Sequence, residues 1–293
     1  MIKETSIIMH FKKNYIDSIY FFAKISTMSS VLIKRSKLNS LLYHWNAGTL
    51  ATSDWLNTQG VYHQLSNTYV KHGWIERLAS GVFKRSGDHI TWQSAVYALQ
   101  KLKGLPVHVG GLSAIELRGY SHFIRNQTSI TLFGDVFRLP SWCYKLSFDE
   151  TKLAYTKASP WESGFSEAIT EYTTDSFELQ VSSLERAITE FLDGVPQRHT
   201  YEEAAHLMEG LTSLRPDVVQ ILLEKCTSIK VNRLFLHLAT ACQHAWLSKI
   251  DRSTIDLGTG IRQIEANGYL DAQHLICVPE EPFGDFYVKK EFL

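Results

Sequence analysis

Signatures of known catalytic sites are missing from this chain of 293 residues. It has no HExxH metalloprotease motif, no GxSxG nucleophile elbow, no GxxxxGK[ST] phosphate loop and no paired-aspartate nucleotidyltransferase pattern. Its 12 histidines are scattered, and the pair His237 and His244 is too far apart for an i, i+4 metal pair on a helix. These absences favour a protein that binds over an enzyme, with no metal and no cofactor.

Cysteines and long apolar runs are also scarce. The chain has four cysteines, which form no CxxC pair and have no histidine at a spacing that suits zinc. We expect small buried thiols in a reducing compartment, hence a cytoplasmic protein. No uninterrupted apolar stretch approaches the roughly 20 residues that span a bilayer, so no membrane partner is expected. The cysteines are Cys143, Cys226, Cys242 and Cys277.

The beginning of the chain, residues 1–35, is poorly patterned. Its first 27 residues are apolar and aromatic, but Lys12, Lys13, Asp17 and Lys24 interrupt them. A secretory signal would instead carry its charges first and then a clean apolar core. The recognisable pattern begins after Met28, so we expect that Met28 is the true start or that residues 1–27 are a dispensable leader.

The net charge of zero conceals an uneven distribution. Residues 1–88 hold 11 Lys and Arg against 5 Asp and Glu, a net +6, and the remainder carries −6. A basic N-terminal third suggests a polyanionic partner at that end, although a chance imbalance on solvated faces gives the same numbers.

Residues 36–88 have the pattern of a winged helix-turn-helix. "KLNSLLYHWNAGTL" repeats apolar residues at helical spacing, and "TSDWLNTQG" and "VYHQLSNTYVKHG" predict two further short helices, each closed by glycine. Two helices joined by a tight glycine turn are typical of a helix-turn-helix. "WIERL" and "VFKR", separated by "ASG", then predict the β-hairpin of a wing.

The third helix predicts a DNA-reading face. On a helical wheel Val61, Tyr62, Leu65 and Tyr69 fall on one side, which we expect to face the core. The opposite side carries amides that suit base edges and a lysine that suits guanine or phosphate. A solvated polar face, or a winged helix that only docks proteins, remains the alternative. The predicted DNA-binding residues are His63, Gln64, Asn67 and Lys71 on the helix, with Arg77, Lys84 and Arg85 on the hairpin.

The remaining residues, 89–293, predict a larger mixed α/β domain. Gly110-Gly111 precedes a short helix but lacks the Lys-Ser/Thr of a phosphate loop, so close backbone packing is favoured. Two capping boxes, at Ser182 with Glu185 and at Thr200 with Glu203, predict helix starts. Asn267-Gly268 predicts a hairpin between the last strands.

A basic stripe marks the helix predicted over residues 229–247. Its side chains fall within about 60° on a flank of the apolar face. These side chains are candidates for contacting a partner macromolecule, or they pair with the surrounding carboxylates. The stripe comprises Lys230, Arg233, His237 and His244.

Several segments resemble one known family. The resemblance extends from about Ser36 to Pro279, and the combination of its segments is more specific than the winged helix alone. These segments resemble the AbiEi antitoxins of type IV toxin–antitoxin systems, which act in abortive infection and phage defence. They are "LNTQGVYHQLSNTYVKHGWIERLASGVFKR", "HVGGLSAIELRGYSHF", "ERAITEFLDGVP" and "LMEGLTSLRPDVVQILLEKCTSIKVNRLFLHLA".

The resemblance implies a cytoplasmic antitoxin with two activities. The winged helix would repress its own promoter, often at inverted repeats, and the C-terminal domain would counteract a nucleotidyltransferase-like toxin, directly or functionally. The basic stripe would then be the candidate contact with the toxin or RNA. The expected fold is α+β, a winged helix-turn-helix followed by a larger mixed α/β domain. The alternatives are a ligand-sensing winged-helix regulator without a toxin partner and a cryptic enzyme carrying a winged helix.

Overall fold

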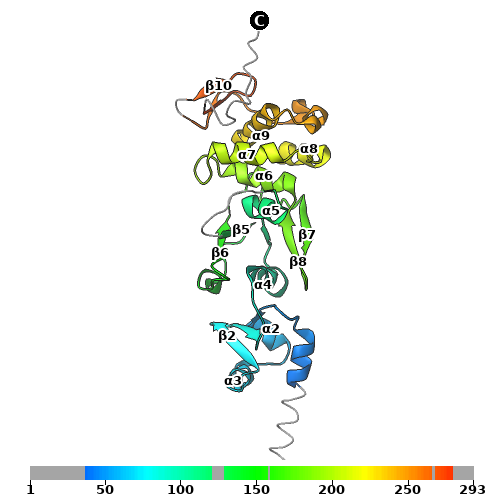
Figure 1. Ribbon diagram of the computed structural model, residues 1–293, viewed down its shortest axis with the longest axis vertical. Helices are drawn as coiled ribbons and strands as arrows, with labels where there is room; N and C mark the ends of the chain where they lie inside the picture. Colours follow the sequence, from blue (N-terminus) through cyan, green and yellow to red (C-terminus); the bar gives the residue numbers. More distant parts are fainter. Residues whose placement is uncertain (1–36, 121–128, 158, 266–267, 280–293) are drawn as a thin grey trace, which may run out of the picture. The chain divides into compact units, whose positions relative to one another are not determined.

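The computed structural model describes residues 37–120, 129–157, 159–265 and 268–279 (Figure 1). The predicted leader lies outside these residues. Within them the chain forms two compact units, which divide between Asp88 and His89, except that Leu78–Ser80 group with the second unit. No helix in the described ranges is long and apolar enough to cross a membrane.

The first unit has the three helices and small sheet of a winged helix. A helix runs through residues 37–44, and the sheet has the strand order β1-β3-β2. The Thr52 side chain caps α2 by accepting a hydrogen bond from the Trp55 amide, and Gly60 turns the chain toward α3 with a φ of +71°. The elements are β1 (Ala51–Thr52), α2 (Ser53–Thr58), α3 (His63–Lys71), β2 (Ile75–Ala79) and β3 (Val82–Arg85).

One hydrophobic core holds these elements together. Each helix and each strand of the unit contributes at least one buried apolar side chain, and Leu65 and Val70 of α3 pack against the edge of the cluster. This core fixes α3 beside the hairpin and leaves its other face outward. The core residues are Leu38, Leu41, Trp45, Ala51, Leu56, Val61, Tyr69, Ile75 and Phe83.

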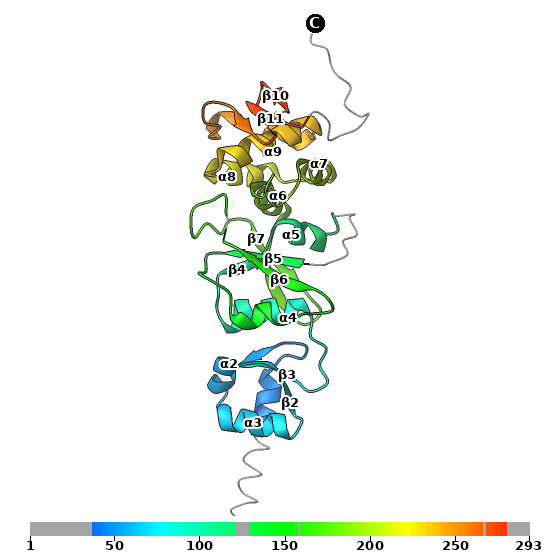
Figure 2. The same ribbon diagram turned by 90° about the vertical axis from the view of Figure 1, so that its left-hand side faces the viewer.

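The second unit is built on a five-stranded mixed sheet of order β6-β5-β4-β8-β7. The pairs β4–β5 and β7–β8 are antiparallel, whereas β4–β8 and β5–β6 are parallel. Helix α4 lies on one side of the sheet, and α5 and α6 lie on the other (Figure 2). The strands are β4 (Val107–Val109), β5 (Ser129–Gly134), β6 (Lys152–Thr156), β7 (Ile169–Thr173) and β8 (Glu178–Ser182).

Helices cover the sheet and continue beyond it as a layer formed by α6 to α9. Thr200 and Glu203 form the predicted capping box of α7, and Pro216 occupies the first turn of α8. The box predicted at Ser182 is wrong, because Ser183 caps α6 instead. The helices are α4 (Trp92–Tyr97), a π-helical turn (Ala98–Leu102), α5 (Gly111–Leu117), a 3-10 turn (Ser141–Tyr144), α6 (Leu184–Asp193), α7 (Tyr201–Gly210), α8 (Pro216–Lys225) and α9 (Ile229–Ala241).

A small three-stranded sheet of order β10-β11-β9 follows α9. Strand β11 pairs antiparallel with β10 and parallel with β9, so the strands on either side of Asn267-Gly268 do not pair with each other, and the hairpin predicted there is wrong. Asn267 itself lies outside the described residues. The elements are two 3-10 turns (Ala245–Lys249 and Arg252–Thr254), β9 (Arg262–Gln263), β10 (Tyr269–Asp271) and β11 (Ile276–Val278).

The fold is therefore α+β, a winged helix followed by a larger α/β unit, as the sequence predicts. The expected buried thiols are confirmed for Cys143 and Cys226, whereas Cys242 and Cys277 are only partly buried. Burial raises the pKa of the Cys143 and Cys226 thiols to about 12. Both therefore stay protonated and unreactive at neutral pH.

Candidate nucleic-acid interface

Helix α3 presents four polar side chains to solvent on one face. His63, Gln64, Asn67 and Lys71 are all exposed, whereas Tyr69 on the opposite face is completely buried. In the described residues no side-chain hydrogen bond or ion pair involves Gln64 or Lys71. Their donors and acceptors are free to meet another molecule.

The structure corrects the sequence prediction at Tyr62, which the helical wheel placed in the core. Tyr62 is 65% exposed, because it is the N-cap of α3 and has an extended backbone with ψ of 170°. The spacing of 100° per residue does not apply to a residue outside the helix. Tyr62 is thus an exposed side chain at the start of α3, and a hydroxyl there can donate to a phosphate.

The hairpin contributes one further exposed basic side chain, that of Arg77 on β2. Its Nη2 donates a hydrogen bond to Oδ1 of Asn67, and its guanidinium lies 5.2 Å from the centroid of the Phe83 ring. The Nδ2 amide group of Asn67 lies 3.4 Å from the His63 ring. Helix and hairpin therefore form one continuous polar surface with a fixed orientation of the Asn67 amide.

The two other basic side chains of the hairpin that were predicted to bind DNA form contacts within the first unit. Lys84 pairs with Glu76 at 3.2 Å and donates to the Asp88 carbonyl, and its ammonium group lowers the pKa of Glu76. Arg85 donates to the Trp45 carbonyl at 3.1 Å. Both side chains are partly buried. They brace the hairpin, so their role in DNA binding, still a prediction, is secondary to that of Lys71 and Arg77.

Most of the basic excess lies outside the winged helix itself. Residues 37–88 carry five Lys and Arg and three Asp and Glu, a net +2, while residues 1–36 carry +4. Charge alone is a weaker argument for DNA here than the arrangement of side chains on α3.

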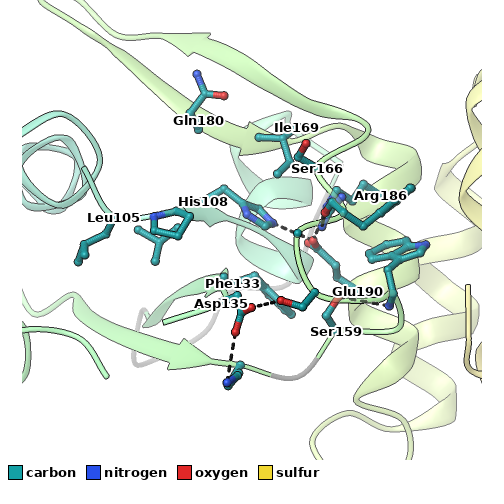
Figure 3. Close-up of a pocket in the computed structure, with 18 of the residues that line it drawn as sticks. Leu105, His108, Phe133, Asp135, Ser159, Ser166, Ile169, Gln180, Arg186 and Glu190 are labelled. Carbon is teal, nitrogen blue, oxygen red and sulfur yellow. Dashed lines mark hydrogen bonds and ion pairs between the residues drawn. The ribbon is translucent and has the colours of Figure 1, made fainter. Parts of the chain in front are cut away.

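The second unit contains a cavity of about 660 Å³ beside the sheet. Figure 3 shows His108, Arg186 and Glu190 meeting at its wall. Trp161, Phe165 and Phe133 contribute apolar surface to the lining. A cavity of this size accommodates a small molecule.

Glu190 is the centre of a buried polar network. Its Oε1 accepts hydrogen bonds from Arg186 and His108, both at 2.8 Å, and its Oε2 accepts from the Gly111 amide and the Ser182 hydroxyl. Burial alone would raise the pKa of Glu190, but the charge and hydrogen bonds of His108 and Arg186 lower it below its usual value. All four lone pairs are used, so this carboxylate joins strands β4 and β8 to α5 and α6.

The expected close packing of the double glycine is confirmed by this network. A Cβ added at Gly110 would lie 2.2 Å from Glu190 Oε2 and 2.6 Å from the Phe133 ring. Gly111 adopts a φ of +53°. Sequence reasoning missed Glu190, although its i, i+4 spacing from Arg186 on α6 was a usable signal.

Within the described residues, the side chains of the predicted basic stripe on α9 are directed mainly at backbone carbonyls of the second unit. Arg233 is 1% exposed and donates to the carbonyls of Leu257, Gly258, Gly260 and Leu275. Lys230 is half-buried and donates to the carbonyls of Asp193 and Val195.

The two histidines of the stripe are buried as well. His237 and His244 are each 8% exposed. His237 lies between Tyr201 and Asp271, and His244 donates to the Met208 carbonyl. Helix α9 ends at Ala241, with Gln243 at a φ of +53°, so His244 is not on the helix at all. These side chains connect segments of the interior.

Comparisons with known proteins agree with this arrangement. A family model described as the transcriptional regulator AbiEi antitoxin N-terminal domain matches residues 34–126. A second, described as the transcriptional regulator, AbiEi antitoxin, type IV TA system, matches residues 127–279. None of the curated proteins compared with the chain matches it.

A solved structure shares the fold. The crystal structure of the RV2827C protein from Mycobacterium tuberculosis matches with a TM-score of 0.52 and 12% sequence identity, over 78% of this chain and 85% of that chain. At this identity the likeness concerns the fold alone. The two family models together cover the winged helix and nearly all of the larger unit. The chain therefore belongs to the AbiEi antitoxins of type IV toxin–antitoxin systems, a family of transcriptional regulators.

Proposed function

We propose that this chain represses its own promoter by placing α3 in the major groove of DNA. The observation that carries the proposal is the exposed row of Gln64, Asn67 and Lys71 on a helix whose other face is locked in the core. A helix fits the major groove, and its N-terminal residues reach base edges when the rest of the domain holds it in place.

The side chains divide into readers and anchors. The amides of Gln64 and Asn67 can each pair with N6 and N7 of adenine. Lys71 and Arg77 supply positive charge that suits phosphates, and His63 and Tyr62 add hydrogen bonds at the start of the helix. Inverted repeats in the promoter would let two copies of the chain bind half-sites related by symmetry.

A footprinting experiment tests this proposal directly. The full chain should protect a segment upstream of its own gene from hydroxyl radicals, and methylation of guanine N7 in the major groove should interfere with binding, whereas methylation of adenine N3 in the minor groove should not. Protection confined to the minor groove, or none over the promoter, would refute placement of α3 in the major groove.

We propose further that residues 89–293 counteract a nucleotidyltransferase-like toxin. Membership of the antitoxin family supports this, as does the presence of a second unit larger than DNA binding requires. Co-expression separates the two activities. The variant Gln64→Ala/Asn67→Ala should lose promoter repression and still rescue growth from the cognate toxin. Loss of rescue by this folded variant, at equal protein level, would show that neutralisation is not independent of the winged helix.

A ligand-sensing regulator is the second candidate function, and the cavity beside Glu190 is the observation that favours it. A metabolite that binds there would change promoter affinity through the second unit. Mass spectrometry of the native protein tests this. A stoichiometric small molecule retained by the purified chain would support the sensor, and a clean protein mass would favour the antitoxin alone.

A further inference from the structure

Three side chains from α9, from β10 and from the turn after β10 meet in the second unit. His237 lies on the helix, Asp271 ends β10, and His274 lies in the turn before β11. Nδ1 of each histidine is 2.6 Å from the same carboxylate oxygen, Asp271 Oδ2. The ligand atoms of this His237–Asp271–His274 cluster all lie within 4.8 Å of one another. Both histidines are buried, at 8% and 4% exposure.

The turn around Asp271 orients the carboxylate. Its Oδ1 accepts hydrogen bonds from the backbone amides of Gln273, at 2.8 Å, and of His274, at 3.3 Å. This arrangement leaves Oδ2 directed at the two imidazoles. The position of the carboxylate is therefore set by the backbone, independently of what lies between it and the histidines.

Hydroxyl groups face the outer nitrogens of both imidazoles. Tyr201 Oη is 2.7 Å from Nε2 of His237, and Thr240 Oγ1 is 3.4 Å from Nε2 of His274. Histidines that bind metals almost always donate their other N–H to a fixed partner, which orients the ring and holds the metal-facing nitrogen unprotonated. Both histidines of the cluster have such a partner at Nε2.

Thr240 adds a constraint on the tautomer of His274. Its hydroxyl proton is directed at the Leu236 carbonyl, 2.7 Å away, so its oxygen acts as an acceptor toward His274 Nε2–H. His274 Nδ1 therefore faces Asp271 Oδ2 at 2.6 Å, as His237 Nδ1 does. A divalent cation between the three atoms would replace these two contacts.

We propose that His237, Asp271 and His274 bind a divalent zinc ion through the two Nδ1 atoms and Oδ2. Two imidazoles with one carboxylate are a ligand set of zinc, whereas magnesium and calcium prefer oxygen alone. Zinc–ligand bonds of about 2.0–2.2 Å place neighbouring ligand atoms about 3.3 Å apart. Binding of zinc therefore lengthens the two Nδ1···Oδ2 contacts, now 2.6 Å, by less than 1 Å and leaves a fourth position for water.

The ion would connect the small C-terminal sheet to the helical layer. This sheet has short strands, and Arg233 and Asn232 already bind it and its preceding loop to α9 through backbone carbonyls. A metal that joins α9 to β10 and the following turn strengthens the same attachment. Because the ion binds only the folded arrangement, zinc raises the melting temperature of the chain.

Zinc titration of the full chain, first freed of metal with a chelator, tests the proposal. Isothermal titration calorimetry should give one zinc per chain with a Kd of about 1 µM or tighter. A hundredfold excess over Kd should raise the melting temperature by about 5 °C or more, and magnesium should not. The Co²⁺-loaded chain should show the visible absorption of a tetrahedral site.

Variants locate the ion. Asp271→Asn and His274→Gln should each weaken zinc binding by at least about tenfold. The matched control His89→Gln removes a histidine that is 72% exposed and should bind zinc like the wild type. Tyr201→Phe keeps all three ligands and should weaken binding by about tenfold, which tests the site even if a ligand variant does not fold. No zinc binding by the wild type, or unchanged affinity in Tyr201→Phe and His274→Gln, overturns the proposal.

Discussion

Arg77 of the hairpin donates a hydrogen bond from Nη2 to Oδ1 of Asn67 on α3, over an N···O distance of 2.5 Å. Ten residues of chain separate them, and both side chains are exposed. The bond fixes which side of the Asn67 amide faces the hairpin and directs Nδ2 toward His63. An amide held in one orientation binds a base edge with less loss of side-chain entropy than a free one.

A double-mutant cycle tests this coupling. We expect Asn67→Ala and Arg77→Ala each to weaken operator binding, and the double variant to lose about 0.5–3 kcal/mol less than the sum of the two. The reason is that each single change also removes the orienting hydrogen bond. Fluorescence anisotropy at fixed salt measures the four affinities. Strictly additive losses would show that the two side chains act independently on DNA.

Salt dependence distinguishes the free lysine from the braced one. Lys71→Ala should weaken binding to every DNA sequence about equally and reduce the log–log salt slope by roughly one, because one phosphate contact is lost. Lys84→Ala should change the slope less and lower the melting temperature, because Lys84 is held by Glu76 and the Asp88 carbonyl. Equal slope changes in the two variants would contradict the different roles.

Local patterns in the sequence were sufficient for the winged helix. Apolar spacing, glycine turns and capping residues all act within a few residues, so the helices and hairpin follow from them. The same method failed at Tyr62 and His244, because both were placed on a helical wheel although they lie outside the helix. Helix ends depend on capping and on residues such as Gln243 with a positive φ, which periodicity does not reveal.

Two glycines provide a matched test of the buried network. Gly110→Ala should destabilise the chain by about 2–4 kcal/mol, because the new Cβ meets Glu190 and Phe133 at less than 3 Å. Gly210→Ala, at the end of α7, has nothing within 4 Å and should be neutral or slightly stabilising. Urea unfolding measures both. Similar stability of the two variants would mean that Glu190 is not fixed where the structure places it.

Acid should lower the stability of the fold through protonation of Glu185. Burial opposes its ionisation, but hydrogen bonds from Arg215 and Ser183 lower the pKa of Glu185 to about 2. A carboxylate with a lowered pKa stabilises the fold above its unfolded value of about 4.5, and this contribution disappears as pH falls toward 2. The free energy of unfolding of the wild type should therefore exceed that of Glu185→Gln by about 2 kcal/mol at pH 7. The difference should become progressively smaller below about pH 5.

Unfolding of both proteins by urea at several pH values measures this difference. The variant replaces the carboxylate by a neutral group of the same shape, so the other titrating groups cancel in the comparison. A difference that does not change between pH 7 and pH 3 would show that Glu185 is not ionised in contact with Arg215.

The polar sites of the second unit were beyond sequence reasoning for a physical reason. Glu190 meets His108 across 82 residues, and Asp271 meets His237 across 34. No local pattern records such pairings, because they depend on which strands and helices become neighbours. For the same reason Arg233 was interpreted as a surface base, although its guanidinium is surrounded by backbone carbonyls from distant loops.

Sequence preference on DNA tests the central claim most directly. Anisotropy titrations should compare the promoter upstream of the chain's own gene with a shuffled duplex of equal composition. The proteins are the wild type, Asn67→Ala and the matched control Asn57→Ala, which changes an exposed residue of α2. Wild type and Asn57→Ala should prefer the promoter alike, while Asn67→Ala loses about 1–3 kcal/mol on the promoter and little on the shuffled duplex. An equal loss on both duplexes, or a wild type without preference, would contradict reading of the promoter by α3.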